Sequence, residues 1–227
     1  MPSVARRLAS AAALAAGLAA APLAAAPFAL QLGDTRLALD APPGFADTGF
    51  TGSPRLVELA ESLTSASNRI LLFAISDADL RRFTLGDPLE LRRYMIAVTP
   101  KGLERDWVGP AQFASFVEEA LRGAGAASPD RNFLRHLDAQ PPGKASLLAE
   151  PRRSLDVVSV LQGTRLPATG RSDETPQYAL STISLIYLRG KALSLAVFTT
   201  YAAPQDLEWI ELTTARWIED LQRLNAR

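Results

Sequence analysis

The sequence predicts an α+β protein, in which a mostly antiparallel sheet has helices packed on its faces and a long C-terminal β-hairpin precedes a C-terminal helix. Two long strand-like runs, 178–188 and 191–201, are separated only by Arg189 and Gly190, which is typical of a hairpin. Residues 204–224 repeat apolar side chains at helical spacing. Strands and helices do not alternate strictly along the chain, and this favours an antiparallel sheet over a parallel one.

The N-terminal half predicts short strands, a helix and two longer strands. Leucines alternate with other residues over 28–40 on both sides of a Gly33-Asp34 turn, which indicates a pair of strands. Ser53 followed by Pro54 is typical of a helix start. The apolar run 69–76 predicts a buried central strand, residues 77–88 a polar loop, and residues 91–98 a second strand.

The C-terminal half predicts two further helices and two further pairs of strands. One helix begins at Pro110 and ends at Gly123. Segments 146–149 and 155–163 predict two strands joined at Pro151, ahead of the 178–201 hairpin. The last helix begins near Pro204, with Trp209 beside its apolar stripe. That stripe comprises Leu207, Ile210, Thr214, Trp217, Ile218, Leu221 and Leu224.

Residues 1–26 predict a cleavable bacterial signal peptide. Arg6 and Arg7 form a positive start, residues 8–21 are apolar and uncharged, and small residues follow. An uncleaved anchor is the alternative, but the run is mostly alanine and is interrupted by Gly17 and Pro22. The arginine pair suggests the twin-arginine route, yet its flanking residues favour general secretion. We therefore expect one α+β domain, 27–227, in the periplasm or outside the cell.

The amino-acid composition excludes several classes of reaction and binding site. The chain has no cysteine, which excludes disulfides, thiolate catalysis, thiolate metal ligation and a lipidated N-terminal cysteine. It carries 24 Lys+Arg and 24 Asp+Glu, so removal of Arg6 and Arg7 leaves a net charge near −2. Such a balance gives no overall field to attract nucleic acid. After residue 26 no hydrophobic run is long enough to span a membrane.

Few patterns point to catalysis. His136 is the one histidine, so a site with several imidazoles cannot form within one chain. Its neighbour Asp138 could orient it as a base, but the sequence has no G-x-S-x-G motif to present a serine, and a surface histidine is the favoured interpretation. Asp77 and Asp79 form a D-x-D pair that could bind a metal through oxygen. A helix cap before Leu80 is the favoured interpretation of that pair.

Candidate binding residues are arginines and one tryptophan. Three double arginines could hold a phosphate or carboxylate if they converged, although neighbours in a strand point to opposite faces. Trp209 could be partly exposed and line a pocket. The candidate residues are Arg81, Arg82, Arg92, Arg152, Arg153 and Trp209, with Arg93 completing the second pair.

Two segments carry a resemblance. LDAPPGFADTG continues through LAESLTSASNRILLFAIS to RRYMIAV, and ISLIYLRGKALSLAVFTTYAAPQDLEWIELTTARWIEDL closes the chain. Together they resemble an uncharacterised family of exported bacterial proteins. The order of the elements is also similar to the Mog1/PsbP-like fold, an antiparallel sheet between helices. That resemblance implies a non-enzymatic accessory or binding role and implies no catalytic residues.

The sequence therefore favours a periplasmic or secreted binding or accessory module without a cofactor or catalytic residues. Its partner would be a protein or a small ligand of the cell envelope. One alternative is a hydrolase that uses carboxylates such as Asp77 and Asp79, with or without a metal. The other is an envelope-associated protein that binds anionic groups through its arginine pairs.

Overall fold

The computed structural model describes residues 27–128, 132–168 and 176–226 of the chain, so the predicted signal segment 1–26 lies outside the described residues. The strands are β1 (Phe28–Leu32), β2 (Thr35–Leu39), β3 (Phe45–Asp47), β4 (Asn68–Ser76), β5 (Arg93–Pro100), β6 (Ala145–Arg153), β7 (Val157–Arg165), β8 (Tyr178–Leu188) and β9 (Lys191–Tyr201). The α-helices are α1 (Pro54–Ser62), α2 (Asp77–Thr84), α3 (Pro110–Leu121), α4 (Phe133–Asp138) and α5 (Pro204–Leu224), and the 3₁₀ turns are η1 (Thr48–Thr51) and η2 (Lys101–Leu103).

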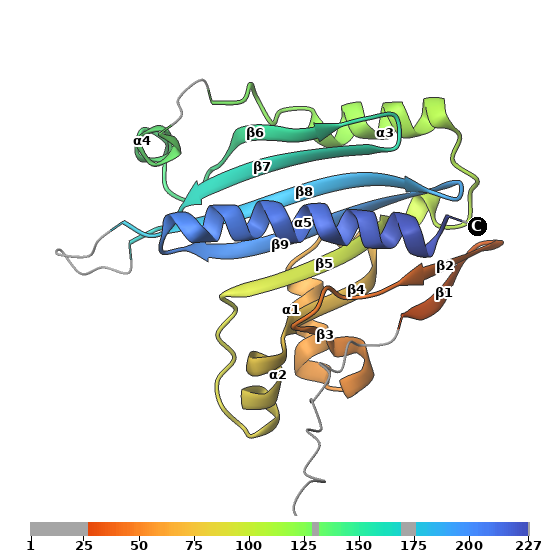
Figure 1. Ribbon diagram of the computed structural model, residues 1–227, viewed down its shortest axis with the longest axis horizontal. Helices are drawn as coiled ribbons and strands as arrows, with labels where there is room; N and C mark the ends of the chain where they lie inside the picture. The colour runs from red at the N-terminus through yellow and green to blue at the C-terminus, as the bar shows by residue number, and fades with distance from the viewer. Residues whose placement is uncertain (1–26, 129–131, 169–175, 227) are drawn as a thin grey trace, which may run out of the picture.

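Seven strands form one antiparallel sheet in the order β3-β4-β5-β9-β8-β7-β6, while β1 and β2 pair separately (Figure 1). The predicted hairpin is its centre: β8 and β9 pair from Tyr178↔Tyr201 to Leu188↔Lys191. Arg189 and Gly190 both have positive φ, at 50° and 77°. This geometry matches the twist of the strands that a two-residue turn must join. The predicted α+β class, hairpin and final helix are confirmed.

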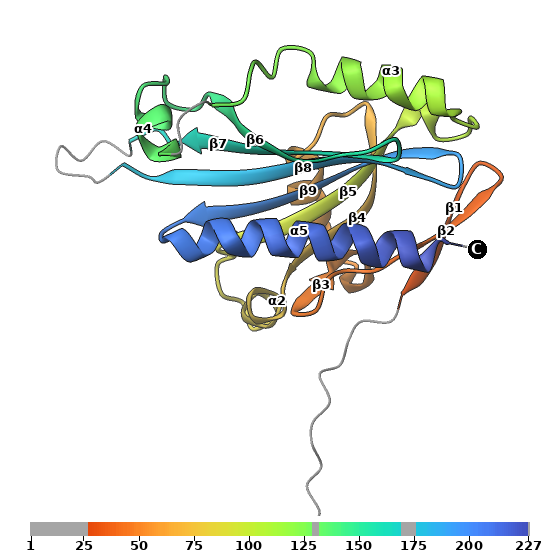
Figure 2. The ribbon, with the colours of Figure 1, turned by 45° about the horizontal axis from the view of Figure 1, so that its top comes forward.

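Helices cover both faces of the sheet, and α3 and α5 lie on opposite sides of it (Figure 2). On one face, α5 and the β1–β2 hairpin share a core with alternate residues of β4, β5, β8 and β9. On the other face, α1 and α2 pack on Phe73, Ile75 and Ile96. Further along that same face, α3 packs on Val158 and Leu185. The sheet is therefore an inner layer that is apolar on both sides.

The C-terminal helix ties the β1–β2 hairpin to the sheet. Trp217 is 1% exposed, and its Nε1 donates to the carbonyl of Asp40 at 2.8 Å. At the helix end, the Asn225 amide donates to the carbonyl of Ala38 (2.8 Å) and accepts from its N–H (2.9 Å). The Asn225 side chain thus satisfies the backbone N–H and C=O of Ala38 as a neighbouring strand would. The β1–β2 hairpin is therefore attached to α5, although among the described residues it pairs with no strand of the main sheet.

Two sequence predictions on the N-terminal half were wrong. The run 69–76 forms β4, but β4 is second from the end of the sheet and the central strand is β9. Residues 77–84 form helix α2, so the polar loop predicted for 77–88 is wrong there, although the helix-cap interpretation of Asp77 and Asp79 anticipated helical residues from Leu80. Ser76 starts that helix, because its Oγ accepts from the N–H of Asp79 at 3.1 Å. A single two-turn helix with no fully buried residue gives too weak an apolar period to be recognised in the sequence.

The third error concerns Pro151. It lies inside β6, and the turn to β7 comes later, at residues 154–156. β6 is an edge strand whose register with β7 shifts between Ala149 and Arg152. A proline cannot donate a ladder hydrogen bond, so an irregular edge strand is where a sheet tolerates it. In the part of the chain that the structure describes, no helix is long and apolar enough to cross a membrane.

Candidate functional site

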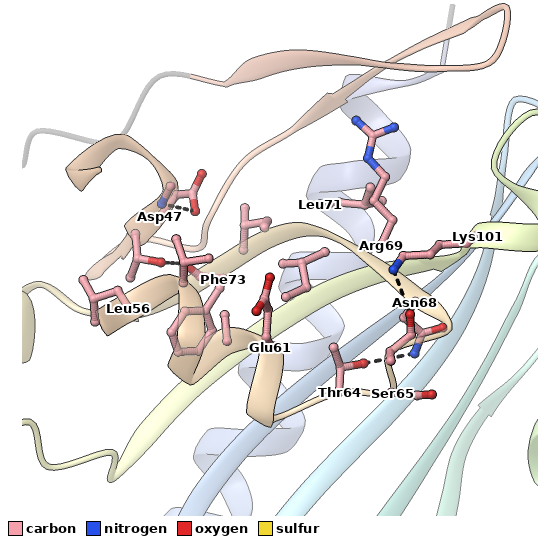
Figure 3. Close-up of a pocket in the computed structure, with 17 residues that line it drawn as sticks. Asp47, Leu56, Glu61, Thr64, Ser65, Asn68, Arg69, Leu71, Phe73 and Lys101 are labelled. Carbon is pink, nitrogen blue, oxygen red and sulfur yellow. Dashed lines mark hydrogen bonds between the residues drawn. The ribbon is translucent and has the colours of Figure 1, made fainter. Parts of the chain in front are cut away.

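A groove of about 700 Å³ with apolar walls lies beside β4, between η1 and α1 (Figure 3). We call it the α1–β4 groove. Its lining combines apolar side chains from the helix and the strand with polar groups at its two ends. The volume lies within the range of pockets that bind small molecules. The apolar lining residues are Leu56, Val57, Ala60, Ile70, Leu71, Leu72 and Phe73.

The groove exists because β3 stops after three residues. Asp47, the last of them, caps η1 by accepting from the N–H of Gly49 at 3.1 Å. The hydroxyl of Thr48 then donates to the carbonyl of Phe73 at 3.0 Å. This side-chain hydrogen bond takes the place of the backbone hydrogen bond that a longer β3 would make there. Gly52 adopts a left-handed conformation, and Pro54 begins α1. The chain therefore turns away from β4 and leaves the space that the next residues of β3 would fill.

The strand that faces the groove is irregular at Leu71. The register of β4 with β5 shifts between Ile70 and Leu72, so Leu71 is an extra residue in the strand. Leu71 and Leu72 both belong to the α5 side of the sheet, whereas Ile70 and Phe73 belong to the α1 side. The bulge thus turns one more leucine toward the β1–β2 hairpin and gives the groove a second apolar wall opposite α1.

Charges gather at the two ends of the groove. Asp47 lies at one end, and Arg69 and Lys101 lie at the other (Figure 3). Arg69 forms an ion pair with Glu104, and its guanidinium also approaches the carbonyl of Gln31 at 3.5 Å. Lys101 donates to the carbonyl of Ala66 at 2.8 Å and is exposed. Because Arg69 is paired, Lys101 provides most of the positive charge at that end, while Glu61 adds a second carboxylate to the lining beside Asp47.

The carboxyl of Asp47 is perturbed by its place in the groove. Burial raises its pKa above the ordinary value of 3.8, against the opposing effect of hydrogen bonds with the N–H groups of Gly49 and Phe73. A carboxylate that is partly desolvated is ready to accept a further donor. An incoming N–H or ammonium group would supply the hydrogen bonds that water no longer donates to this carboxylate.

A second cavity, of about 450 Å³, contains several of the residues singled out in the sequence. Arg82, Arg92 and Arg93 line it. Arg92 and Arg93 were expected to point to opposite faces of a strand, but β5 begins at Arg93, so the alternation does not extend to Arg92. The structure thus brings Arg82, from the first arginine pair, to the same cavity as both members of the second pair, Arg92 and Arg93.

Carboxylates balance these arginines. Asp79, Glu90 and Asp206 line the same cavity. Arg82 lies 3.6 Å from Asp87 and 3.8 Å from Glu90, and Arg93 pairs with Asp206 at 2.7 Å. With as many carboxylates as guanidinium groups, the cavity does not concentrate positive charge, and we do not place an anion site there.

Trp209 belongs to this network. The Arg93 guanidinium lies 4.1 Å from the centre of its ring, a cation–π contact. Its ring also packs against Phe45, with 6.0 Å between the ring centres. As the sequence predicted, Trp209 is partly exposed, but it does not line either of these two cavities.

The remaining arginines lie elsewhere. Arg81 is exposed and donates to the carbonyl of Asp77 at 3.2 Å, within its own helix. On β6, Arg152 donates to Gln222 at 3.3 Å and Arg153 pairs with Glu150 at 2.5 Å. The three pairs therefore do not converge on one anion.

The candidate metal ligands and the histidine have structural surroundings. Asp77 and Asp79 lie in the first turn of α2, and Asp79 accepts from the hydroxyl of Ser76 at 2.7 Å. His136 lies in the last turn of α4, while Asp138 accepts from the hydroxyl of Tyr178 at 2.6 Å. Within 27–128, 132–168 and 176–226, no three His, Asp or Glu residues are arranged to hold a metal ion.

The sequence alone does not predict the α1–β4 groove. The signal was present in the run Asp47-Thr-Gly-Phe-Thr-Gly-Ser-Pro54, where glycine and proline cut a strand short. The run could not reveal that β4 lies next to it, nor that no other strand of the described residues fills the gap.

Comparison with known proteins gives only a distant likeness. No protein-family model and no curated protein sequence matches the chain. Among solved structures, the Ran-binding protein Mog1p of Saccharomyces cerevisiae is similar at 12% identity and a TM-score of 0.35, over 89% of this chain and 93% of that one. A point mutant of Mog1 gives 13% identity and a TM-score of 0.37, over 89% and 94%. The expected resemblance to the Mog1/PsbP-like fold is thus found again, and we transfer no residue or partner from it.

Proposed function

We propose that this chain is an exported, non-catalytic binding or accessory module of the cell envelope, and that the α1–β4 groove is its binding surface. The observation that carries the proposal is the groove itself: an apolar cavity of about 700 Å³ that opens on the surface, with opposite charges at its ends. Most other polar side chains of interest are engaged in structural contacts. Arg93, Asp206 and Asp79, for example, fix helix starts and ion pairs.

Export is supported by the sequence of residues 1–26, and the binding role by the kind of surface that the groove presents. Apolar walls provide affinity through burial, and charged ends orient what is bound. Val57 is 51% exposed on the wall of the groove, and Phe50, next to Gly49 of the lining, is 76% exposed. Exposed apolar side chains that adjoin an apolar groove extend the surface that a partner could cover.

The test compares two matched substitutions. Val57 and Leu212 are both helical apolar residues and both are 51% exposed, but only Val57 lines the groove. The tagged protein is purified from the periplasm of its own host, unchanged and as Val57→Glu and Leu212→Glu. We expect a stoichiometric partner that is lost with Val57→Glu and kept with Leu212→Glu. Retention of the partner by both variants, or saturable turnover of a substrate by the pure protein, would contradict the proposal.

A further inference from the structure

In the part of the chain that the structure describes, the stretch of β4 in the groove has a strand neighbour on one side only. β3 pairs with Ala74, Ile75 and Ser76, and the carbonyl of Phe73 accepts a hydrogen bond from the side chain of Thr48. On that side, no strand within the described residues pairs with 68–73, whereas β5 pairs with the other side of the same stretch. An unpaired strand edge presents backbone N–H and C=O groups that another extended chain can bind.

This edge is recessed between two apolar walls. Leu56, Val57 and Ala60 of α1 form one wall, and the bulged Leu71 belongs to the other. Side chains of an added strand would point alternately to the two walls, so both walls favour apolar side chains. Bulges and charges also protect exposed sheet edges from pairing with whole domains. The walls beside this edge add a steric restriction, because the recess has room for a single extended segment and obstructs the edge of a second sheet.

The charges set the direction of that segment. An antiparallel strand would begin near Asp47 and end near Arg69 and Lys101, which is also the direction that β3 already follows. Arg69 is already paired with Glu104, so acidic side chains at the C-terminal end of the segment would meet chiefly the exposed Lys101. The opposite direction would place the same acidic side chains beside Asp47.

We propose that residues 69–72 of β4 bind an extended peptide segment of a partner protein as an added antiparallel strand, with apolar side chains at alternate positions and acidic side chains at its C-terminal end. This inference rests on the proposed binding function and specifies its partner. Four strand residues at about 3.3 Å each span roughly 13 Å, so a peptide of about seven residues covers the free edge and both charged ends.

The probe is a random heptapeptide library selected on the purified protein, with Val57→Glu protein as the counter-selection. The enriched peptides are synthesised and their binding is measured by fluorescence anisotropy. Each peptide is then methylated on one backbone nitrogen at a time. In an antiparallel pair, alternate N–H groups face the neighbouring strand. We therefore expect methylation at every second residue to weaken binding by about tenfold or more, and methylation at the intervening residues to have little effect.

Direction is tested with charge. Lys101→Glu should weaken the acidic peptides by about two- to fivefold, as expected for an exposed ion pair. The matched control is Lys144→Glu, since Lys144 is exposed and does not line the groove. Peptides whose acidic residues are moved to the N-terminal end should bind more weakly to the unchanged protein.

Several results would overturn the strand proposal: no enriched peptide, methylation tolerated at every position, binding that survives Val57→Glu, or a dimer of the protein that Val57→Glu dissociates. If a periplasmic partner is lost with Val57→Glu while the methylation pattern is absent, the binding function stands and the strand mode fails. If neither partner nor peptide depends on Val57, both proposals fail.

Discussion

At the residue scale, Asp47 connects the end of β3, the start of η1 and the groove. Its carboxylate caps η1 through the N–H of Gly49, and burial raises its pKa. Because the pKa is higher in the folded than in the unfolded chain, the folded protein holds the proton more tightly. The free energy of unfolding contributed by this group therefore falls as pH rises from the ordinary value of 3.8 through the raised one.

Asp47→Asn tests this. Asparagine removes the titration and keeps an oxygen that can cap η1. We expect the variant to gain stability relative to the unchanged protein as pH rises from about 3 to 7. Urea unfolding at both pH values measures the difference, and Asp34→Asn, at an exposed turn, controls for the loss of one surface charge. A relative stability of Asp47→Asn that is constant or falls with pH would contradict the assignment.

Lys191 shows what single-residue reasoning misses. It is 2% exposed, and its Nζ donates to the carbonyls of Glu104 (3.1 Å) and Asp106 (2.6 Å). A lysine at the start of a hairpin strand is expected in solvent. The tertiary structure buries it because the 104–106 segment crosses over that end of β9 and offers two carbonyls that need a donor.

At the element scale, α5 is where the sequence prediction and the structure agree most closely. Five residues of the predicted stripe are buried: Ile210, Thr214, Trp217, Ile218 and Leu221. A helix of 21 residues shows the apolar period six times, so its buried face could be recognised without knowing its partner. The short helix α2 offers no such repetition, so the sequence indicates only a capped helical turn from Leu80 and does not give the helix its full length.

Trp217→Ala tests the role of that face. The ring is 1% exposed and its Nε1 holds the carbonyl of Asp40, so the substitution should cost about 3–5 kcal/mol of unfolding free energy. Trp209→Ala is the matched control on the same helix: that ring is partly exposed, and its loss should cost clearly less. Chemical denaturation measures both. Equal losses would show that the two faces of α5 contribute equally to stability.

At the scale of the whole molecule, strand order decides where a partner can bind. β9 is central, and the apolar strand β4 is close to the edge and is only half covered by β3. The apolar run of β4 predicted burial on both faces, and the structure shows this, since its residues contribute to two cores. A strand can be buried on both faces and still lack a paired strand along one edge. The groove lies along the part of the β4 edge that β3 does not cover.

The export prediction also belongs to the whole chain. In the native host, we expect the periplasmic or secreted protein to lack about the first 26 residues, because the apolar run with its preceding arginines directs secretion and cleavage. Intact-mass measurement and N-terminal sequencing of the extracted protein check this. Leu14→Arg places a charge in the apolar run and should leave the full-length chain in the cytoplasm. A full-length wild-type chain in the membrane fraction would instead indicate an uncleaved anchor.

The sequence by itself determined the elements that depend on local pattern: the 178–201 hairpin with its two-residue turn, the face of α5, and the α+β class. It also named Arg82, Arg92 and Asp79, which the structure brings to one cavity. Only the tertiary structure decided that carboxylates neutralise those arginines, that β4 lies near the edge, and that β3 ends early enough to open a groove beside it. The physical reason is that periodicity shows which face of an element is apolar, whereas strand order and cavities depend on which of those faces meet across the folded chain.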